Sequence, residues 1–111
     1  MRSEMLDAKL ALEQVGVEPH LFRPPGGSFS GDVVETARRM GMRVVLWSVD
    51  PQDWRNGATT TQIVVNVLSN VHPGSIVLLH DGGGDQSATV RALPQIIKGL
   101  RKMHLRIKPV R

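Results

Sequence analysis

The amino-acid sequence predicts a parallel-stranded α/β fold of about four βα units, which would form either a small open sheet or a partial (β/α) barrel. Short β-branched and apolar runs alternate with longer segments whose apolar residues recur every three to four positions, the patterns of strands and helices. Strands that alternate with helices pair in parallel through right-handed crossovers. Because 111 residues suffice for one modest domain, we expect residues 1–111 to form a single domain.

The first expected elements are a helix and a strand that runs into two prolines. Residues 4–15 carry apolar side chains at helical spacing, and Gly16 can end this helix in the left-handed conformation. Residues 17–22 should be extended, because Pro24 and Pro25 exclude a helix at this point.

The second expected helix covers residues 31–40 and follows a loop of small residues. The loop contains Gly26, Gly27, Ser28 and Ser30, and either Ser30 or Asp32 can cap the helix. Gly41 should end it. Residues 43–49 are β-branched and aromatic, which favours a strand.

The last elements repeat the alternation. Residues 59–71 predict a helix capped from within Thr59 to Thr61, and residues 75–79 predict a strand buried on both faces. After Gly82-Gly83-Gly84, Ser87 can cap a helix that runs to about residue 103. The alternating residues 105–110 predict a final strand near a sheet edge.

Polar side chains follow the ends of three predicted strands. Arg23 follows the first, Asp50 and Asp53 the second, and His80 and Asp81 the third. Because the carboxyl ends of parallel strands converge, we expect these side chains, with Trp54, to share one rim.

His80 is the strongest single candidate for catalysis. A carboxylate beside an imidazole favours the protonated ring and holds one tautomer, as general acid catalysis requires. The alternative is a histidine that satisfies a backbone carbonyl at a strand end.

The other rim residues also have two interpretations each. Asp50 and Asp53 could be turn formers around Pro51. Trp54 could form the wall of a small pocket or a lid over the core edge. Arg23 could orient a carboxylate or pair with a surface acid.

Composition excludes several classes of site. The chain has no cysteine, and no two of its four histidines are spaced i, i+4, so we expect no metal cage. The net charge of +4 is mild and no aromatic-rich basic stripe is present, which argues against a nucleic-acid partner. No apolar run is long enough for a membrane span or a signal peptide, so the compartment stays open. The glycine-rich loop at residues 82–84 could cradle a phosphate, but no Walker-type lysine follows it.

Three segments together resemble the third, fourth and fifth motifs of the polysaccharide deacetylase (NodB homology) family, carbohydrate esterase family four. In chain order they are Leu21-Phe22-Arg23-Pro24-Pro25-Gly26-Gly27, Asp50-Pro51-Gln52-Asp53-Trp54 and Ile76-Val77-Leu78-Leu79-His80-Asp81. The resemblance covers essentially the whole chain. It implies a hydrolase of non-peptide carbon–nitrogen bonds that removes N- or O-acetyl groups from chitin-like chains, peptidoglycan or xylan. The complete family fold is a distorted (β/α) barrel with a divalent metal, usually zinc.

The resemblance also implies catalytic roles. His80 would be the general acid that protonates the leaving amine or alcohol, and Asp53, or else Asp50, would tune it. Arg23 would orient the catalytic base.

The expected substrate pocket comes from the same motifs. Trp54 and Leu78 would line the space for the acetyl methyl group. The backbone around Gly26, next to Pro25, would lie at the oxyanion.

The sequence departs from the family in its first two motifs, an Asp-Asp pair and a His-x-x-x-His pair, which supply the base and the metal ligands. Neither occurs in residues 1–111. We therefore expect the C-terminal portion of a deacetylase domain, a truncated NodB-type barrel that alone has no deacetylase activity and no cofactor.

The partners expected from this interpretation are an acetylated polysaccharide and a second polypeptide. Exposed sheet edges would favour a homodimer, a domain swap or a partner chain. A full-length parent would be secreted or belong to the cell envelope. The alternatives are a non-catalytic glycan-binding or assembly module and a small phosphate-binding protein.

Overall fold

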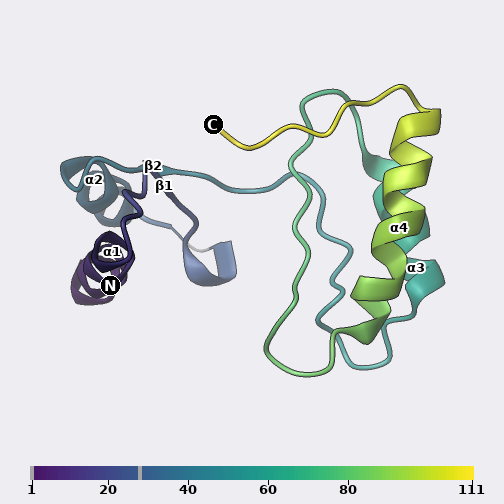
Figure 1. Cartoon of the computed structure of the whole chain (residues 1–111), viewed down its shortest axis with the longest axis horizontal. Coiled ribbons are helices and arrows are strands. Elements are labelled where there is room, and N and C mark those ends of the chain that lie inside the picture. The colour runs from purple at the N-terminus through teal and green to yellow at the C-terminus, as the bar shows by residue number, and fades with distance from the viewer. Residues whose placement is uncertain (1, 28) are drawn as a thin grey trace. The chain divides into compact units, whose positions relative to one another are not determined.

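The computed structural model describes residues 2–27 and 29–111, which form two compact units, Met1–Leu46 and Trp47–Val110. Figure 1 shows the chain, a mixture of helices and short strands as expected for an α/β fold. The elements are, in order, α1 (Arg2–Gln14), β1 (Leu21–Phe22), the 3-10 helix η1 (Pro25–Gly27), α2 (Gly31–Arg39), β2 (Arg43–Val44), α3 (Thr60–Asn70) and α4 (Ser87–Lys102). The single domain stays a prediction.

The first unit packs α1 and α2 around three buried side chains. Met5 of α1, Ala37 of α2 and Met42 form this cluster, and residues of β1 and β2 cover part of it. Strands β1 and β2 are parallel, with Leu21 opposite Arg43. The predicted parallel pairing is therefore confirmed here, although each strand has two residues.

Glycines end both helices of this unit, as predicted. Gly16 has φ +82°, and the N–H groups of Gly16 and Val17 return to carbonyls in the last turn of α1. Gly41, with φ +77°, closes α2 in the same way. Both are Schellman motifs, in which glycine adopts the left-handed conformation at little cost.

The start of α2 resolves the alternative between two caps. The Ser30 side chain accepts a hydrogen bond from the Val33 N–H at 3.4 Å, so Ser30 is the N-cap and Asp32 lies within the first turn. Ser28, expected in the preceding loop, lies outside the described residues.

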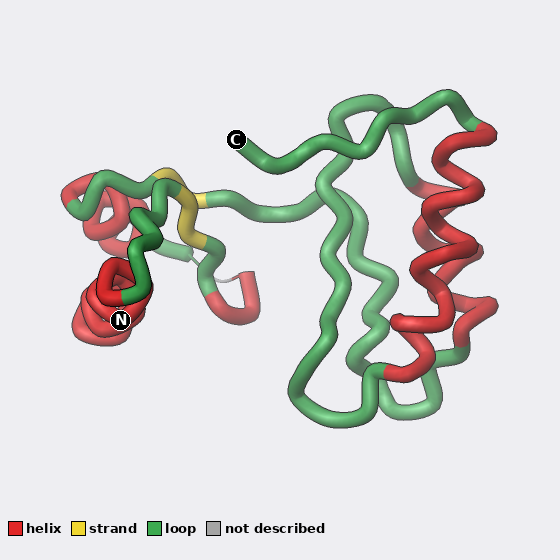
Figure 2. The backbone as a smooth tube through the Cα atoms, viewed as in Figure 1, coloured by secondary structure: helices red, strands yellow, loops and turns green. Residues whose placement is uncertain are grey.

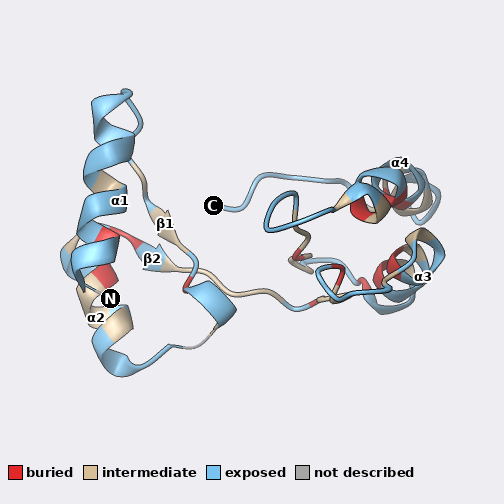
Figure 3. Cartoon of the chain, turned by 90° about the horizontal axis from the view of Figure 1, so that it is seen from below, coloured by how far each residue is buried: buried red, intermediate tan, exposed pale blue. Residues whose placement is uncertain are grey.

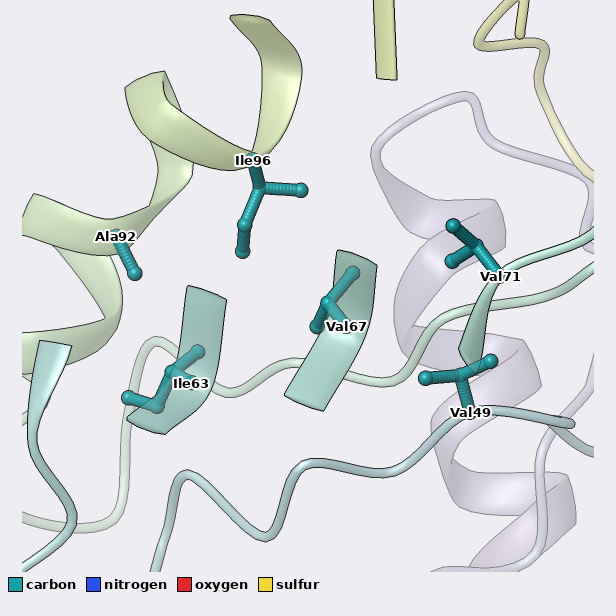
Figure 4. Close-up of a cluster of buried hydrophobic side chains, with 6 residues drawn as sticks. All are labelled: Val49, Ile63, Val67, Val71, Ala92 and Ile96. Carbon is teal, nitrogen blue, oxygen red and sulfur yellow. The ribbon is translucent and has the colours of Figure 1, made fainter. Parts of the chain in front are cut away.

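The second unit is built on the packing of α3 against α4, which lie side by side in Figures 1 and 3. Thr59 caps α3 in a capping box with Gln62, as the threonine run predicted. Figure 4 shows the buried cluster between the helices and the chain that crosses beneath them. Its members are Val49, Ile63, Val67, Val71, Ala92 and Ile96.

The predicted long strands are largely wrong in this unit. Figure 2 shows mostly loop between β2 and α3 and between α3 and α4. The predicted strands 43–49 and 75–79 meet at one isolated parallel bridge, Val49 with Val77. In the predicted strand 75–79, Leu78 is buried, whereas Ile76, Val77 and Leu79 are half-buried.

The final strand, predicted at 105–110, is also wrong. Within the described chain, residues 105–111 form neither helix nor strand, and residues 106–111 are exposed. An alternating pattern becomes a strand only when a neighbour pairs with its backbone. His104, with φ +58°, instead ends α4 in a third Schellman motif, in which Leu105 N–H bonds to Leu100 O at 3.0 Å.

The start of α4 also differs from the prediction. Ser87 is the first helical residue rather than the cap, and its N–H donates to Asp85 Oδ1 at 2.9 Å. The N-cap is Gln86, whose side chain makes no capping hydrogen bond. None of the helices in residues 2–27 and 29–111 has the length and apolar character that crossing a bilayer requires.

Candidate active site

The parallel bridge between Val49 and Val77 brings two loops together in the second unit. Leu78 N–H donates to Val49 O at 2.9 Å, and both chains then leave the bridge in the same direction. Asp53 and His80 each follow within a few residues, at the carboxyl ends of the two extended segments, which is where polar side chains gather in parallel α/β folds.

Asp53 is the centre of the hydrogen-bond network. Its Oδ2 accepts from the backbone N–H of His80 at 2.8 Å and from the hydroxyl of Thr89 at 2.7 Å. Its Oδ1 lies 2.9 Å from His80 Nδ1. The Asp53 carboxylate thus joins its own loop to the His80 loop and to α4.

The Asp53 side chain has no exposed surface, whereas 31% of the His80 side chain is exposed. Burial opposes ionisation of Asp53. The hydrogen bonds from the His80 ring, the His80 backbone and the Thr89 hydroxyl outweigh it and hold the pKa of Asp53 below its ordinary value. The site therefore holds a buried carboxylate beside a partly exposed imidazole.

This pairing assigns different tasks to the two ring nitrogens of His80. The Asp53 carboxylate can only accept hydrogen bonds, so Nδ1 must carry the proton that lies between them. Nε2 is then the nitrogen at which a proton can be exchanged. A histidine oriented by a buried carboxylate in this way can act as a general acid or base.

Asp50 has the role of a turn former. Its Oδ1 accepts the backbone N–H of Gln52 at 2.9 Å, and Gln52 adopts a positive φ of 54°. This is an Asx turn, which shapes the loop that carries Asp53. Of the two aspartates in the motif, Asp53 is therefore the one that contacts His80.

Trp54 is 53% exposed. The Arg55 guanidinium lies 5.6 Å from the centroid of its ring, a cation–π contact. Leu78 is buried, with 7% exposure. Because Val77 and Leu79 pack against the core cluster, the alternation of an extended chain directs Leu78 to the other side.

The remaining predicted site residues, Arg23, Pro25 and Gly26, belong to the first unit. Arg23 follows β1 and is exposed. Pro25 and Gly26 lie in η1, where Gly26 has φ +69°. Asp81, adjacent to His80, is exposed.

Thr89 is a site residue that sequence reasoning missed. It is 6% exposed and occupies the first turn of α4. The available signal was its spacing: Thr89, Ala92 and Ile96 form one buried stripe at i, i+3 and i+7, so a hydroxyl on this stripe needs an internal partner.

The described residues do not form a metal centre. No group of three or more histidine, cysteine, aspartate or glutamate side chains in residues 2–27 and 29–111 could hold a metal ion. The side chains of this part of the chain thus do not fit the divalent metal that the family resemblance implies.

Comparisons with known proteins agree with the motifs. Residues 1–45 match the family model for polysaccharide deacetylase. A peptidoglycan-N-acetylglucosamine deacetylase of Bacillus cereus is 45% identical over 112 residues, covering 99% of this chain and 52% of that protein. This chain therefore spans about half the length of that curated relative.

The backbone of this chain is also similar to parts of solved structures. A family 4 carbohydrate esterase from Streptomyces lividans, in complex with acetate, gives a TM-score of 0.88 at 32% identity, over 99% of this chain and 55% of that one. A family 4 pseudoenzyme from Bacillus anthracis gives 0.86 at 29% identity, over 95% of this chain and 36% of that one. The motifs, the family model and these backbones agree: the chain belongs to the polysaccharide deacetylase family, carbohydrate esterase family four, and matches a portion of its members.

Proposed function

We propose that this chain is the portion of a polysaccharide deacetylase that carries the general acid. Such an enzyme hydrolyses N- or O-acetyl groups on chitin-like, peptidoglycan or xylan polymers. The observation that carries the proposal is the His80–Asp53 pair, in which a fully buried carboxylate orients a partly exposed imidazole. The 45% identity to a peptidoglycan deacetylase supports the same reaction class.

His80 is the general acid in this proposal. When the tetrahedral intermediate collapses, protonated Nε2 gives its proton to the departing nitrogen or oxygen, because an unprotonated amine or alkoxide is a poor leaving group. Asp53 stabilises the charged ring and holds its orientation. Asp50 shapes the loop and does not act on His80.

The pocket residues are assigned by the family motifs. Trp54 and Leu78 bound the space for the acetyl methyl group, and Pro25 and Gly26 lie near the oxyanion. Arg23 orients a catalytic base that the chain itself does not supply. Two observations support these assignments: Trp54 is more than half exposed in the loop that carries Asp53, and no heavy atom beyond the two chain neighbours lies within 4 Å of the place where a side chain of residue 26 would begin, which leaves the Gly26 backbone room for a ligand.

The fold proposal is equally specific. We assign β1, β2 and the segment at Val77 to successive strands of a (β/α) barrel, supported by the parallel pairing of β1 with β2 and of Val49 with Val77. A second copy, a swapped segment or a partner chain could supply segments that close such a barrel. A complete protein of this kind would act on cell-wall polymers and be secreted or held in the cell envelope.

The metal belongs to the complete enzyme in this proposal, since the described side chains do not fit it. Residues 1–111 alone should therefore bind zinc weakly and release no acetate from an acetylated chitooligosaccharide. Turnover by the purified 111-residue chain would contradict this division of the machinery.

A chimera tests the proposal. Residues 1–111 replace the matching half of the Bacillus cereus relative, and acetate release from peptidoglycan fragments and chitooligosaccharides is measured. We expect activity that His80→Ala reduces by at least about 100-fold, within the range attributed to general acid catalysis. His72→Ala, at an exposed histidine of the same unit, is the matched control and should leave activity unchanged. Equal activities of the two variants would refute the role of His80.

A second candidate function is a non-catalytic glycan-binding module. It is favoured by the similarity to a family pseudoenzyme. It predicts an inactive chimera, but saturable glycan binding by the 111-residue chain that neither His80→Ala nor a chelator changes. Absence of binding at millimolar glycan would exclude it.

A further inference from the structure

The second oxygen of the Asp53 carboxylate is held from two directions. The His80 backbone N–H approaches Oδ2 from the loop at 2.8 Å, and the Thr89 hydroxyl approaches it from α4 at 2.7 Å. A carboxylate can turn about its last side-chain bond, and two donors on Oδ2 fix that rotation. With Oδ2 fixed, Oδ1 remains directed at His80 Nδ1, 2.9 Å away.

Thr89 is the link between this network and the rigid part of the unit. The residue is 6% exposed and lies on the stripe of α4 that also buries Ala92 and Ile96 in the core between α3 and α4. The backbone of α4 is thus anchored by packing. The loops that carry Asp53 and His80 meet at an isolated bridge instead of a continuous sheet.

The hydroxyl of Thr89 has more than one possible hydrogen-bond acceptor. A threonine hydroxyl near a helix N-terminus can bond to neighbouring backbone groups, but it has one proton, and Thr89 donates that proton to Asp53. Each buried polar side-chain atom among the described residues has a partner. Removing this donor leaves Oδ2 with one fewer donor in a site that has no exposed carboxylate surface.

We propose that Thr89 is a positioning residue for the proposed acid. Through Asp53 it keeps the proton of His80 on Nδ1 and keeps Nε2 as the nitrogen that exchanges a proton with the substrate. Thr89 itself contacts no reacting atom. The inference rests on the proposed function for the role of His80, whereas the hydrogen-bond relay is a property of the folded chain alone.

The test compares Thr89→Val, which keeps the shape and removes the hydroxyl, with Thr89→Ser, which keeps the hydroxyl. The 15N resonances of the neutral imidazole rings in the full 111-residue chain show which nitrogen carries the proton. We expect the Nδ1–H form of His80 to dominate in the wild type and in Thr89→Ser. In Thr89→Val its fraction should fall by at least about half, because the carboxylate is free to turn. The exposed His72 should show the same tautomer mixture in all three proteins.

Each outcome decides the inference. The inference is overturned if His80 in Thr89→Val has the same tautomer as in the wild type. It is also overturned if Thr89→Ser loses as much of the Nδ1–H form of His80 as Thr89→Val does. If Thr89→Val does not fold, the wild type still decides, since a dominant Nε2–H form there contradicts the relay.

Activity separates this inference from the proposed function. In the active chimera, Thr89→Val should lower kcat by at least about tenfold, leave KM unchanged, and be rescued by Thr89→Ser. An inactive chimera with the expected tautomers would refute the proposed function and leave the relay intact. An active chimera in which Thr89→Val leaves the His80 tautomer unchanged would refute the relay and leave the proposed function intact.

Discussion

Removing the Asp53 carboxylate should be among the most destabilising single changes in the second unit. Asp53→Ala leaves the His80 backbone N–H and the Thr89 hydroxyl without their acceptor at a site with no exposed carboxylate surface. Each orphaned buried donor costs about 1–3 kcal/mol, so the free energy of unfolding should fall by about 2–6 kcal/mol. Asp53→Asn keeps one oxygen for both donors and loses the charge, so it should cost about 1–2 kcal/mol.

Urea unfolding followed by tryptophan fluorescence measures this directly, because Trp47 and Trp54 both belong to the unit that contains Asp53. The matched control is Asp50→Ala, which removes the single hydrogen bond of a half-buried turn and should cost about 1 kcal/mol. An Asp53→Ala variant no less stable than Asp50→Ala would refute the view that this carboxylate organises the site.

Three further predictions concern stability. Folding lowers the pKa of Asp53, so the ionised carboxylate contributes fully to the free energy of unfolding above its ordinary pKa of about 3.9, and this contribution is lost as the pH falls through the lowered pKa. The difference in urea midpoint between the wild type and Asp53→Asn should therefore become smaller below about pH 4. His104→Gly should raise the free energy of unfolding by up to about 1 kcal/mol, because His104 holds φ +58°, and a lower thermal midpoint would contradict this reason. Ile63→Ala, at a core position that is 1% exposed, should lower the free energy of unfolding in urea by about 2–5 kcal/mol. Val65→Ala, on the same helix and 57% exposed, should change the free energy of unfolding by less than about 0.5 kcal/mol. Similar losses in the two variants would show that the cluster in Figure 4 is not the core.

The helices could be predicted because their signals are local. Helical spacing, the threonine cap before α3 and the glycines after α1 and α2 act within one or two turns, and the structure has each of them. The exception is Ser87, which is the first helical residue of α4 while Gln86 is the N-cap and the Ser87 N–H bonds to Asp85 Oδ1. Which residue takes the N-cap position depends on backbone geometry that the residue types alone do not specify.

The strands were harder because their signals depend on distant partners. Residues 43–49 have strand composition throughout, yet the first two pair with β1 and Val49 forms a bridge with Val77. The alternation at 105–110 predicted a strand that is absent from the described chain. A strand exists where another segment supplies hydrogen bonds, and composition does not identify that segment.

Part of the candidate site could be predicted from the sequence and part could not. The order of elements correctly directed attention to the ends of extended segments, where Asp53 and His80 lie in contact. Residue type alone could not separate Asp53 from Asp50, since an aspartate before proline suits a turn and a catalytic pair equally well. Thr89 was missed because its role follows from which face of α4 is buried, and the apolar residues Val90 and Leu93 of the same helix are exposed.

The general acid role of His80 is tested most directly by changing the leaving group. In the active chimera, His80→Ala is compared with the wild type on an N-acetylated chitooligosaccharide, whose amine must be protonated to leave, and on 4-nitrophenyl acetate, whose phenolate leaves without a proton. We predict that His80→Ala lowers kcat/KM by at least about 100-fold on the amide and by less than about threefold on the nitrophenyl ester. Equal losses on the two substrates would contradict the assignment of His80 as the acid that the buried Asp53 holds in place.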